Sequence, residues 1–420
     1  MKKYARYKDS GISWIGDVPE HWDVRYLFQK VREHYISNKE VHHQNLLSLS
    51  YGRIIQKDIN KTEGLLPESF DTYQIVENGN IVLRLTDLQN DHKSLRVGLV
   101  TQEGIITSAY ECLEVFDNSL LPVYLYYQLH SFDIKKMFYG MGGGLRQNLN
   151  YNELKKIRMV VPSLPEQKAI AEYLDKKTAQ INELVSAKQK QIELLKEYKQ
   201  SVIANAVTGK LDERREKRKW KDSGISWIGK IPENWEVDKL GHRFIQRKEK
   251  VSDKDYPPLS VSKMGVTPQL ESACKTDDGD NRKLVLKGDF VVNSRSDRKG
   301  SCGLSELDGS VSLINIVATP RNIDGHYIHY LFRSNNYIEE FYRMGRGIVS
   351  DLWTTRWSEM RTIMIPVPPL SEQKEIVAYI EKKVSSIDSQ IASIENQIAN
   401  LNEYKQSLIS DVVTGKVKVC

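Results

Sequence analysis

Two glycine-rich segments carry side chains that could bind nucleic acid, namely Met141–Asn150 (MGGGLRQNLN) and Arg343–Arg356 (RMGRGIVSDLWTTR). Glycine allows close backbone approach to a partner, and Arg, Gln and Asn pair with purine edges or with phosphates. Further polar and basic residues follow two expected strands, Gly79–Leu83 and Gly288–Val292. The candidate contact residues are Arg84, Arg146, Gln147 and Asn148 in the first half and Arg295, Arg298, Arg346 and Arg356 in the second. For each of them, an ion pair or a loop cap within the domain is the alternative role.

Motifs for catalysis are absent from the sequence. The chain has no GxxxxGK[ST] phosphate loop, no GxGxxG that opens a helix, no HExxH and no CxxC pair. The segment Tyr256–Leu259 (YPPL) does not match the [ND]PP[YFW] tetrapeptide of amino-methyltransferases. The four cysteines fall at no metal-ligand spacing and are expected to be free thiols. The sequence therefore predicts no catalytic residues, no metal site and no cofactor in this chain.

A repeated apolar stripe predicts two long helices. The pentapeptide EYKQS occurs at Glu197–Ser201 and again at Glu403–Ser407, and Val161–Leu211 aligns with Val367–Val417 without a gap. Apolar residues recur every seven positions, with a second set four residues further on, which is typical of helices that pack as a coiled coil. The predicted interface comprises Leu174, Ile181, Val185, Ile192, Leu195 and Val202 in the first helix, and Ile380, Val384, Ile387, Ile391, Ile394, Ile398, Leu401 and Leu408 in the second.

Both helices have the same start and stop signals. Prolines lie at or before the first turn (Val161–Gln167, VPSLPEQ; Val367–Gln373, VPPLSEQ), where a missing N–H is not needed. Each helix ends at a Thr-Gly-Lys, in which glycine suits the left-handed residue that closes a helix. At 1.5 Å per residue, about 40 residues give a helix roughly 60 Å long.

A second repeat marks the start of each half. Lys8–Gly16 (KDSGISWIG) is identical to Lys221–Gly229, and each copy continues into Pro-Glu-X-Trp. The tryptophans of this repeat are expected to be buried within their own domains. The chain is therefore two copies of one module, each with an opening segment, a divergent middle and a long helix. We predict an α+β fold: two globular α/β domains separated by two long antiparallel helices in a coiled coil, with pseudo-two-fold internal symmetry.

Composition sets only broad limits. The chain has 420 residues, 40% hydrophobic and 28% charged, and a net charge of +6. This modest charge is weak support for a nucleic-acid partner on its own. Because no run of about 18 apolar residues and no signal-peptide core occurs, we expect a cytoplasmic protein without membrane contact.

The ordered motifs resemble the specificity subunit of type I restriction-modification systems. They are the KDSGxxWIGxxPExW opening, the divergent middle, the LPEQ or LSEQ helix start and the EYKQSxIxxxVTGK helix end, each present twice. The resemblance implies target-recognition domains at 1–162 and 210–368, conserved spacer helices at 163–209 and 369–416, and a tail at 417–420. Each recognition domain would read one half of a bipartite, asymmetric DNA site.

The resemblance also implies partners and a division of labour. The helices would set the spacer and dock two modification (methyltransferase) subunits, which use S-adenosylmethionine, while restriction/translocase subunits use ATP and magnesium. The chain itself would be a non-catalytic subunit that binds double-stranded DNA. The alternative from a different class is a repeat scaffold that binds no DNA and whose coiled coil joins protein partners. An independent enzyme is disfavoured by the missing motifs.

Overall fold

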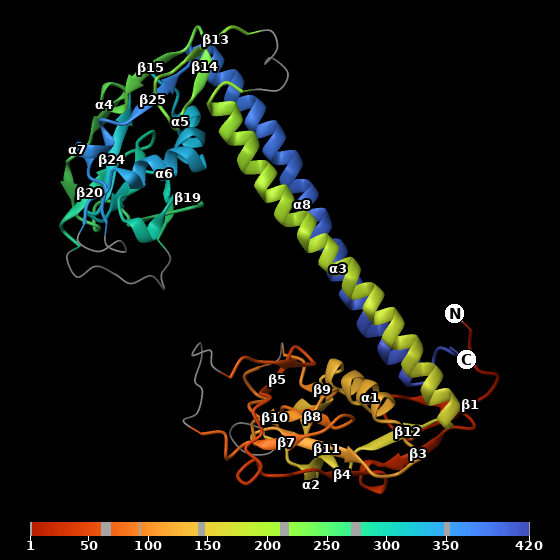
Figure 1. Cartoon of the computed structure of the whole chain (residues 1–420). Helices are drawn as coiled ribbons and strands as arrows, with labels where there is room; N and C mark the ends of the chain where they lie inside the picture. The colour runs from red at the N-terminus through yellow and green to blue at the C-terminus, as the bar shows by residue number, and fades with distance from the viewer. Residues whose placement is uncertain are drawn as a thin grey trace. The chain divides into compact units, whose positions relative to one another are not determined.

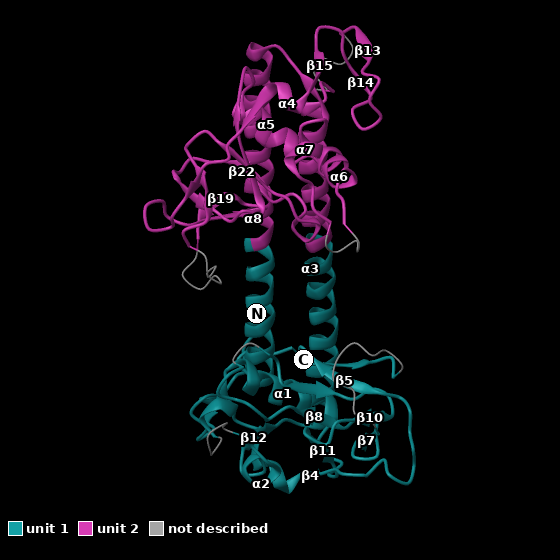
Figure 2. Cartoon of the chain, turned by 90° about the vertical axis from the view of Figure 1, so that its left-hand side faces the viewer, with its two compact units in different colours: residues 1–188, 396–420 teal, residues 189–395 magenta. Residues whose placement is uncertain are grey.

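The computed structural model describes residues 2–59, 69–91, 94–141, 148–210, 218–269, 279–347 and 353–419. The chain divides into two compact units, residues 1–188 with 396–420 (unit 1) and residues 189–395 (unit 2) (Figure 2). The chain has two long helices, α3 (Leu164–Val207) and α8 (Leu370–Val413) (Figure 1). The division falls within both of them, so each unit contains part of each helix (Figure 2). The predicted mixed α+β fold with two long helices is confirmed.

Unit 1 is built on small antiparallel sheets. The largest has the order β4-β11-β8-β9, and β1-β2, β3-β12, β5-β6 and β7-β10 are pairs. Its elements are β1 (Tyr7–Asp9), β2 (Asp17–Pro19), β3 (Asp23–Tyr26), η1 (Leu27–Gln29), β4 (Val31–Glu33), β5 (Leu47–Ser50), β6 (Arg53–Gln56), β7 (Gln74–Val76), β8 (Ile81–Leu83), β9 (Val97–Leu99), β10 (Gly104–Ile106), β11 (Glu111–Val115), α1 (Pro122–Ile134), η2 (Met137–Gly140), α2 (Tyr151–Leu154) and β12 (Arg158–Val161).

Unit 2 repeats this plan with one additional strand, β17, which extends the β20-β23 pair to three strands. Its four-stranded sheet has the order β16-β24-β21-β22, and the remaining sheets are β13-β14, β15-β25, β18-β19 and β17-β20-β23. Its elements are β13 (Trp220–Asp222), β14 (Lys230–Pro232), β15 (Glu236–Lys239), α4 (Leu240–Arg243), β16 (Phe244–Gln246), β17 (Lys250–Val251), β18 (Leu259–Ser262), β19 (Gly265–Pro268), β20 (Arg282–Val285), β21 (Phe290–Asn293), η4 (Ser296–Arg298), β22 (Cys302–Leu304), β23 (Gly309–Val311), β24 (Asn315–Pro320), α5 (Gly325–Phe332), α6 (Asn335–Arg343), α7 (Trp357–Met360) and β25 (Met364–Val367).

Each unit has its own core, in which the central strand is apolar on both faces. All three residues of β8 are buried in unit 1, and the first three of β21 are buried in unit 2. Of the four tryptophans expected to be buried, Trp22 and Trp235 are 0% exposed, whereas Trp14 and Trp227 are half-buried and pack against the cores of their units. Burial of side chains this large contributes strongly to stability, so these tryptophans have a packing role.

The Glu-Gln pair at the start of each long helix ties the helix to its unit. Gln167 is fully buried; its amide donates to the Pro162 carbonyl (2.8 Å), and its Oε1 accepts from the Leu121 N–H (2.8 Å). Gln373 is placed in the same way, with Pro368 at 2.8 Å and the Asp324 N–H at 2.7 Å. A buried amide left unpaired is costly, and both glutamines have partners at their oxygen and nitrogen atoms.

The Thr-Gly end of each long helix closes a unit. In unit 1, the C-terminal end of α8 packs on the opening segment, and the Tyr124 hydroxyl lies 3.2 Å from the carbonyl oxygens of both Val413 and Val160. In unit 2, the end of α3 takes the same place, and the Tyr327 hydroxyl lies 3.1 Å from the Val207 oxygen. The last residues of the chain also pair with the first, since the Lys418 N–H donates to the Lys2 carbonyl (2.9 Å).

The two long helices pack antiparallel within each unit. In unit 1, Lys405 Nζ donates to Asn182 Oδ1 (3.0 Å), and in unit 2 Lys199 Nζ binds Asp388 Oδ1 (2.7 Å). Of the predicted interface residues, Leu174, Ile181, Ile192, Val202, Ile380, Ile387, Ile394 and Leu408 are buried, and Val185, Leu195, Val384, Ile391, Ile398 and Leu401 are half-buried.

Candidate nucleic-acid interface

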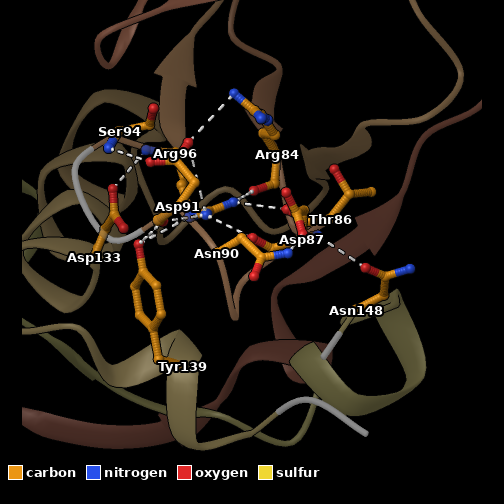
Figure 3. Close-up of polar contacts among 10 residues, drawn as sticks. All are labelled: Arg84, Thr86, Asp87, Asn90, Asp91, Ser94, Arg96, Asp133, Tyr139 and Asn148. Carbon is orange, nitrogen blue, oxygen red and sulfur yellow. Dashed lines mark hydrogen bonds and ion pairs between the residues drawn. The ribbon is translucent and has the colours of Figure 1, made fainter. Parts of the chain in front are cut away.

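One buried side chain, Arg96, shapes the polar segment that follows β8 in unit 1. Its guanidinium is 0% exposed and donates to the carbonyl oxygens of Arg84 (3.0 Å), Thr86 (2.9 Å) and Asp91 (2.6 Å) (Figure 3). Its Nε donates to the Tyr139 hydroxyl at 3.1 Å. A guanidinium offers five N–H donors in a fixed fork, so this one side chain fixes the backbone of the turn from Arg84 to Asp91.

The described candidates of unit 1 lie on this turn. The Arg84 guanidinium is about one-third exposed and lies 3.6 Å from an Asp91 carboxylate oxygen. Asn148 is exposed, and its Oδ1 accepts the Asp87 N–H at 2.9 Å, so that its amide nitrogen points away from the turn (Figure 3). Arg146 and Gln147 lie outside the described residues.

In unit 2, the two predicted loops meet through backbone pairing. Thr354 pairs as an antiparallel bridge with Arg295 on one side and with Arg346 on the other. The Ser296 N–H donates to the Trp353 carbonyl at 2.9 Å. Segments more than 40 residues apart in sequence thus form one polar strip, which we define as Arg295, Arg346, Thr354 and Arg356. The strip contains three of the four arginines predicted for unit 2.

The four candidate arginines of unit 2 differ in their partners. Arg295 and Arg298 both lie against Asp297, at 3.0 Å and 3.5 Å. Arg346 is 83% exposed, with Glu359 at 3.9 Å. Arg356 precedes α7, where its N–H donates to a Glu359 carboxylate oxygen (3.1 Å), and its side chain has no ion pair among the described residues. Exposed ion pairs contribute little to stability, so these side chains can exchange a carboxylate for another anion.

The polar segments of the two units share one backbone frame. In unit 1, the Leu149 N–H donates to the Leu85 carbonyl (3.0 Å), and in unit 2 the Thr355 N–H donates to the Ser294 carbonyl (3.0 Å). The next residue begins a short helix in each unit, Asn150 before α2 and Arg356 before α7. The same frame therefore presents different side chains at matching positions.

Two parts of this site had no motif in the sequence. Arg96 lies in an apolar run, LRVGLV, immediately before β9, and it belongs to no recognised motif. A set of cations near Arg356 was also missed, namely Lys239, Lys248, Lys283 and Arg361, because these residues are scattered over more than 100 positions. Strand pairing, rather than sequence proximity, brings them together.

Asp133 accepts a hydrogen bond from the Arg96 backbone, and its pKa predicts how the stability of unit 1 depends on pH. Its side chain is fully buried, and its Oδ2 accepts the Arg96 backbone N–H at 2.6 Å (Figure 3). Burial raises the pKa of Asp133 to about 6. Between the ordinary aspartate pKa and about 6, folded unit 1 therefore binds a proton that the unfolded chain has released, so its stability falls as pH rises through this window.

We expect Asp133→Asn to remove this pH dependence and to stabilise unit 1 at neutral pH by about 1–3 kcal/mol, since one pKa unit corresponds to about 1.4 kcal/mol. The asparagine Oδ1 can still accept the Arg96 N–H. Urea midpoints from pH 4 to pH 7 measure the effect. Parallel pH profiles for the variant and the natural chain would contradict a proton bound at this position.

Within the described ranges, no cluster of three or more His, Cys, Asp or Glu side chains could hold a metal ion. No described helix is long and apolar enough to cross a membrane. The described candidate residues present arginine and amide donors, some of them paired with carboxylates, on loops that follow strands. Such groups can bind and discriminate a polyanion.

The comparisons identify the class of protein. Residues 51–194 match the family model "Type I restriction modification DNA specificity domain". Residues 51–194 thus carry this DNA specificity domain, and the chain is similar over nearly its whole length to specificity subunits of type I restriction enzymes.

One similar protein aligns with nearly the whole chain and another with about two thirds of it. The type I restriction enzyme MjaVIII specificity subunit of Methanocaldococcus jannaschii is 25% identical over 96% of this chain and 94% of its own. The EcoKI specificity subunit of Escherichia coli is 23% identical over 65% of this chain and 61% of its own. The similarity to M. jannaschii thus includes both modules.

Two solved structures share the fold. One, from a study of complex assembly and conformational transition of the type I R-M system, is 14% identical with a TM-score of 0.69, covering 95% of this chain and 99% of that chain. The other is the HsdS subunit from Thermoanaerobacter tengcongensis, 14% identical with a TM-score of 0.51, covering 95% and 98%. At this identity they support the fold alone.

Proposed function

We propose that the chain reads a bipartite, asymmetric DNA sequence, with each unit contacting one half through its polar segment. The observation that carries this proposal is that the two polar segments have the same backbone hydrogen bond but different side chains. The bond runs from the Leu149 N–H to the Leu85 carbonyl in unit 1 and from the Thr355 N–H to the Ser294 carbonyl in unit 2. Arg and Asn side chains at exposed loop positions suit base edges and phosphates. Because the two sets differ, the two halves of the target differ as well.

The proposal assigns chemistry to partner subunits. Two modification subunits dock on the helices and transfer methyl groups from S-adenosylmethionine, and restriction/translocase subunits use ATP and magnesium in the cytoplasm. The long helices, through their fixed register, set the number of unread base pairs. The partly buried pair Lys405–Asn182 supports this role, since a polar pair within a helix interface specifies register; Lys199–Asp388 is its exposed counterpart in unit 2.

Salt-dependent DNA binding tests the proposal. We expect the full chain, with its modification subunits, to shift a labelled duplex in a gel, and the logarithm of its affinity to fall linearly with the logarithm of salt concentration as counterions are restored. A protein scaffold without DNA binding would retain the partner subunits but leave the duplex unshifted at low salt. That result would favour the alternative function.

A further inference from the structure

A groove of about 830 Å³ lies beside the polar strip of unit 2. Its described lining includes Thr354 and Arg356 of the strip, together with side chains from β15, β16, β20, α7 and the loops between them. Five of the lining side chains are lysine or arginine: Lys239, Lys248, Lys283, Arg356 and Arg361. Among the described lining residues there is no aspartate or glutamate.

These cations have no carboxylate partner within the part of the chain that the structure describes. Lys239, Lys248, Arg356 and Arg361 are exposed, and none of them forms an ion pair there. Lys283 is half-buried; its Nζ donates to the Asn315 carbonyl at 2.6 Å, and burial lowers its pKa. Unpaired cations lining one concave surface create a positive potential that attracts a polyanion.

The larger cavity of unit 2, about 980 Å³, provides a contrast. Its lining includes Asp297, Glu339 and Glu340 alongside Lys299 and Arg343. Lys299 is paired with Glu339 at 3.0 Å, and Arg343 with Glu340 at 2.7 Å. Its cations are already neutralised, so this cavity does not favour phosphate as the basic groove does.

Strand register identifies the matching face of unit 1. In unit 1, Glu33 pairs with Leu113, which pairs with the first residue of β8. In unit 2, Gln246 pairs with Ala318, which pairs with the first residue of β21. Glu33 and Gln246 therefore occupy equivalent positions. By the same register, Glu111 of unit 1 matches Ile316 of unit 2. Two carboxylates therefore replace an amide and an apolar side chain.

The lysines of the groove also have no counterpart in unit 1. Tyr26 pairs with Arg158, the first residue of β12, and Lys239 pairs with Met364, the first residue of β25. Tyr26 therefore takes the position of Lys239. Two residues beyond β4, Tyr35 takes the position of Lys248. Tyr26 is 45% exposed and stacks on Phe28 with ring centroids 5.5 Å apart. Burial, and then the charge of Glu33, raises the pKa of Glu111. Lys155 takes the position of Arg361, since its carbonyl accepts the Phe28 N–H (3.1 Å) as the Arg361 carbonyl accepts the Gly241 N–H (2.9 Å). This face of unit 1 therefore keeps one cation of the groove and adds two carboxylates and two tyrosines.

We infer that the basic groove of unit 2 holds the phosphate backbone of bound DNA and that the matching face of unit 1 does not. The inference rests on the proposed DNA-reading function and adds an asymmetry to it. Unit 2 supplies most of the salt-dependent affinity through this groove. Unit 1 relies more on the residues of its polar turn.

The test compares two triple variants of the full chain with equal loss of charge. The first is Lys239→Gln/Lys248→Gln/Arg361→Gln, in the groove. The control is Lys221→Gln/Lys230→Gln/Lys254→Gln, three exposed lysines of unit 2 outside the groove lining and without ion pairs among the described residues. The probe is a labelled random-sequence duplex, since phosphates are present in any sequence, and the readout is the slope of log affinity against log salt.

We expect the groove variant to reduce the magnitude of the slope by about 2–3, roughly one for each phosphate that the variant no longer neutralises, and the control to leave it unchanged. Equal slopes for the groove variant and the natural chain would overturn the inference, while steep salt dependence in the natural chain would leave the proposed function standing. Failure of the natural chain to bind any duplex would instead overturn the function.

A single variant tests the asymmetry. Glu33→Gln removes a negative charge from the matching face of unit 1, and the salt slope should stay unchanged because no phosphate lies there. A slope that becomes steeper or a clear rise in affinity would show that DNA lies against this face in unit 1 as well.

Discussion

Replacing Arg96 with methionine is expected to destabilise unit 1 by about 3–5 kcal/mol, the cost of breaking a buried charged network. Methionine fills much of the same volume but donates no hydrogen bond. The carbonyl oxygens of Arg84, Thr86 and Asp91 would be left without their guanidinium donors, and a polar group that is buried without a partner costs about 1–3 kcal/mol. Chemical denaturation of the full chain measures the change in the free energy of unfolding.

Arg32→Met is the matched control for this change. Arg32 makes a two-pronged ion pair with Glu114, at 2.9 Å and 2.7 Å, but its side chain is 61% exposed. Pairs at the surface contribute at most about 1 kcal/mol, so this variant should unfold close to the natural chain. Equal effects from both substitutions would mean that Arg96 does not hold the turn.

The Arg96 variant also has a functional signature. Because the turn carries Arg84 and the Asp87 N–H that positions Asn148, its disruption should weaken reading of one half of the target and leave DNA binding by unit 2 intact. Hydrogen exchange of the amides from Arg84 to Asp91 should accelerate. Unchanged exchange in the variant would contradict this role.

Gly415→Ala should destabilise unit 1 by about 2–5 kcal/mol. Gly415 has φ +74°, where an L-residue costs about 1–2 kcal/mol. A Cβ there would collide with Pro19 Cδ and lie 2.7 Å from Pro19 Cγ and 3.1 Å from Trp22 Cη2. These rings are packed in the core, so the collision adds about 1–3 kcal/mol of overpacking.

Gly16→Ala separates the two contributions to this destabilisation. Gly16 has φ +76°, nearly the same backbone conformation, but nothing lies within 4 Å of a Cβ built there. It should therefore cost only the backbone part, about 1–2 kcal/mol. Urea unfolding of both variants measures the difference. Similar destabilisation by both would show that the helix end does not pack tightly on Pro19.

Much of the fold could be predicted because its signals are local. The heptad stripe and the Pro and Gly punctuation predicted helices close to the observed Leu164–Val207 and Leu370–Val413. The strands β8 (Ile81–Leu83) and β21 (Phe290–Asn293) overlap the two segments expected to be strands, Gly79–Leu83 and Gly288–Val292. These elements depend on neighbouring residues, and periodicity reports them directly.

The candidate site was harder to predict because it depends on pairing between distant segments. The glycine loops were identified by composition, but the meeting of Arg295, Arg346 and Thr354 requires strand register that a single sequence does not specify. The basic groove combines Lys248 with Arg361, more than 100 residues apart, and the divergent middles contain no pattern that links them. Arg96 was missed because its partners are backbone oxygens, which have no sequence signature.

The way each long helix closes a unit has a consequence for synthesis. Unit 2 is one continuous segment, 189–395, whereas unit 1 needs residues 396–420 to complete its core around Tyr124 and Val413. On the ribosome, the second module can therefore finish folding before the first, although the first emerges earlier. Until the final helix turns have been translated, the amino-terminal module exposes the apolar surface that they will cover, and a chaperone has that interval in which to bind it.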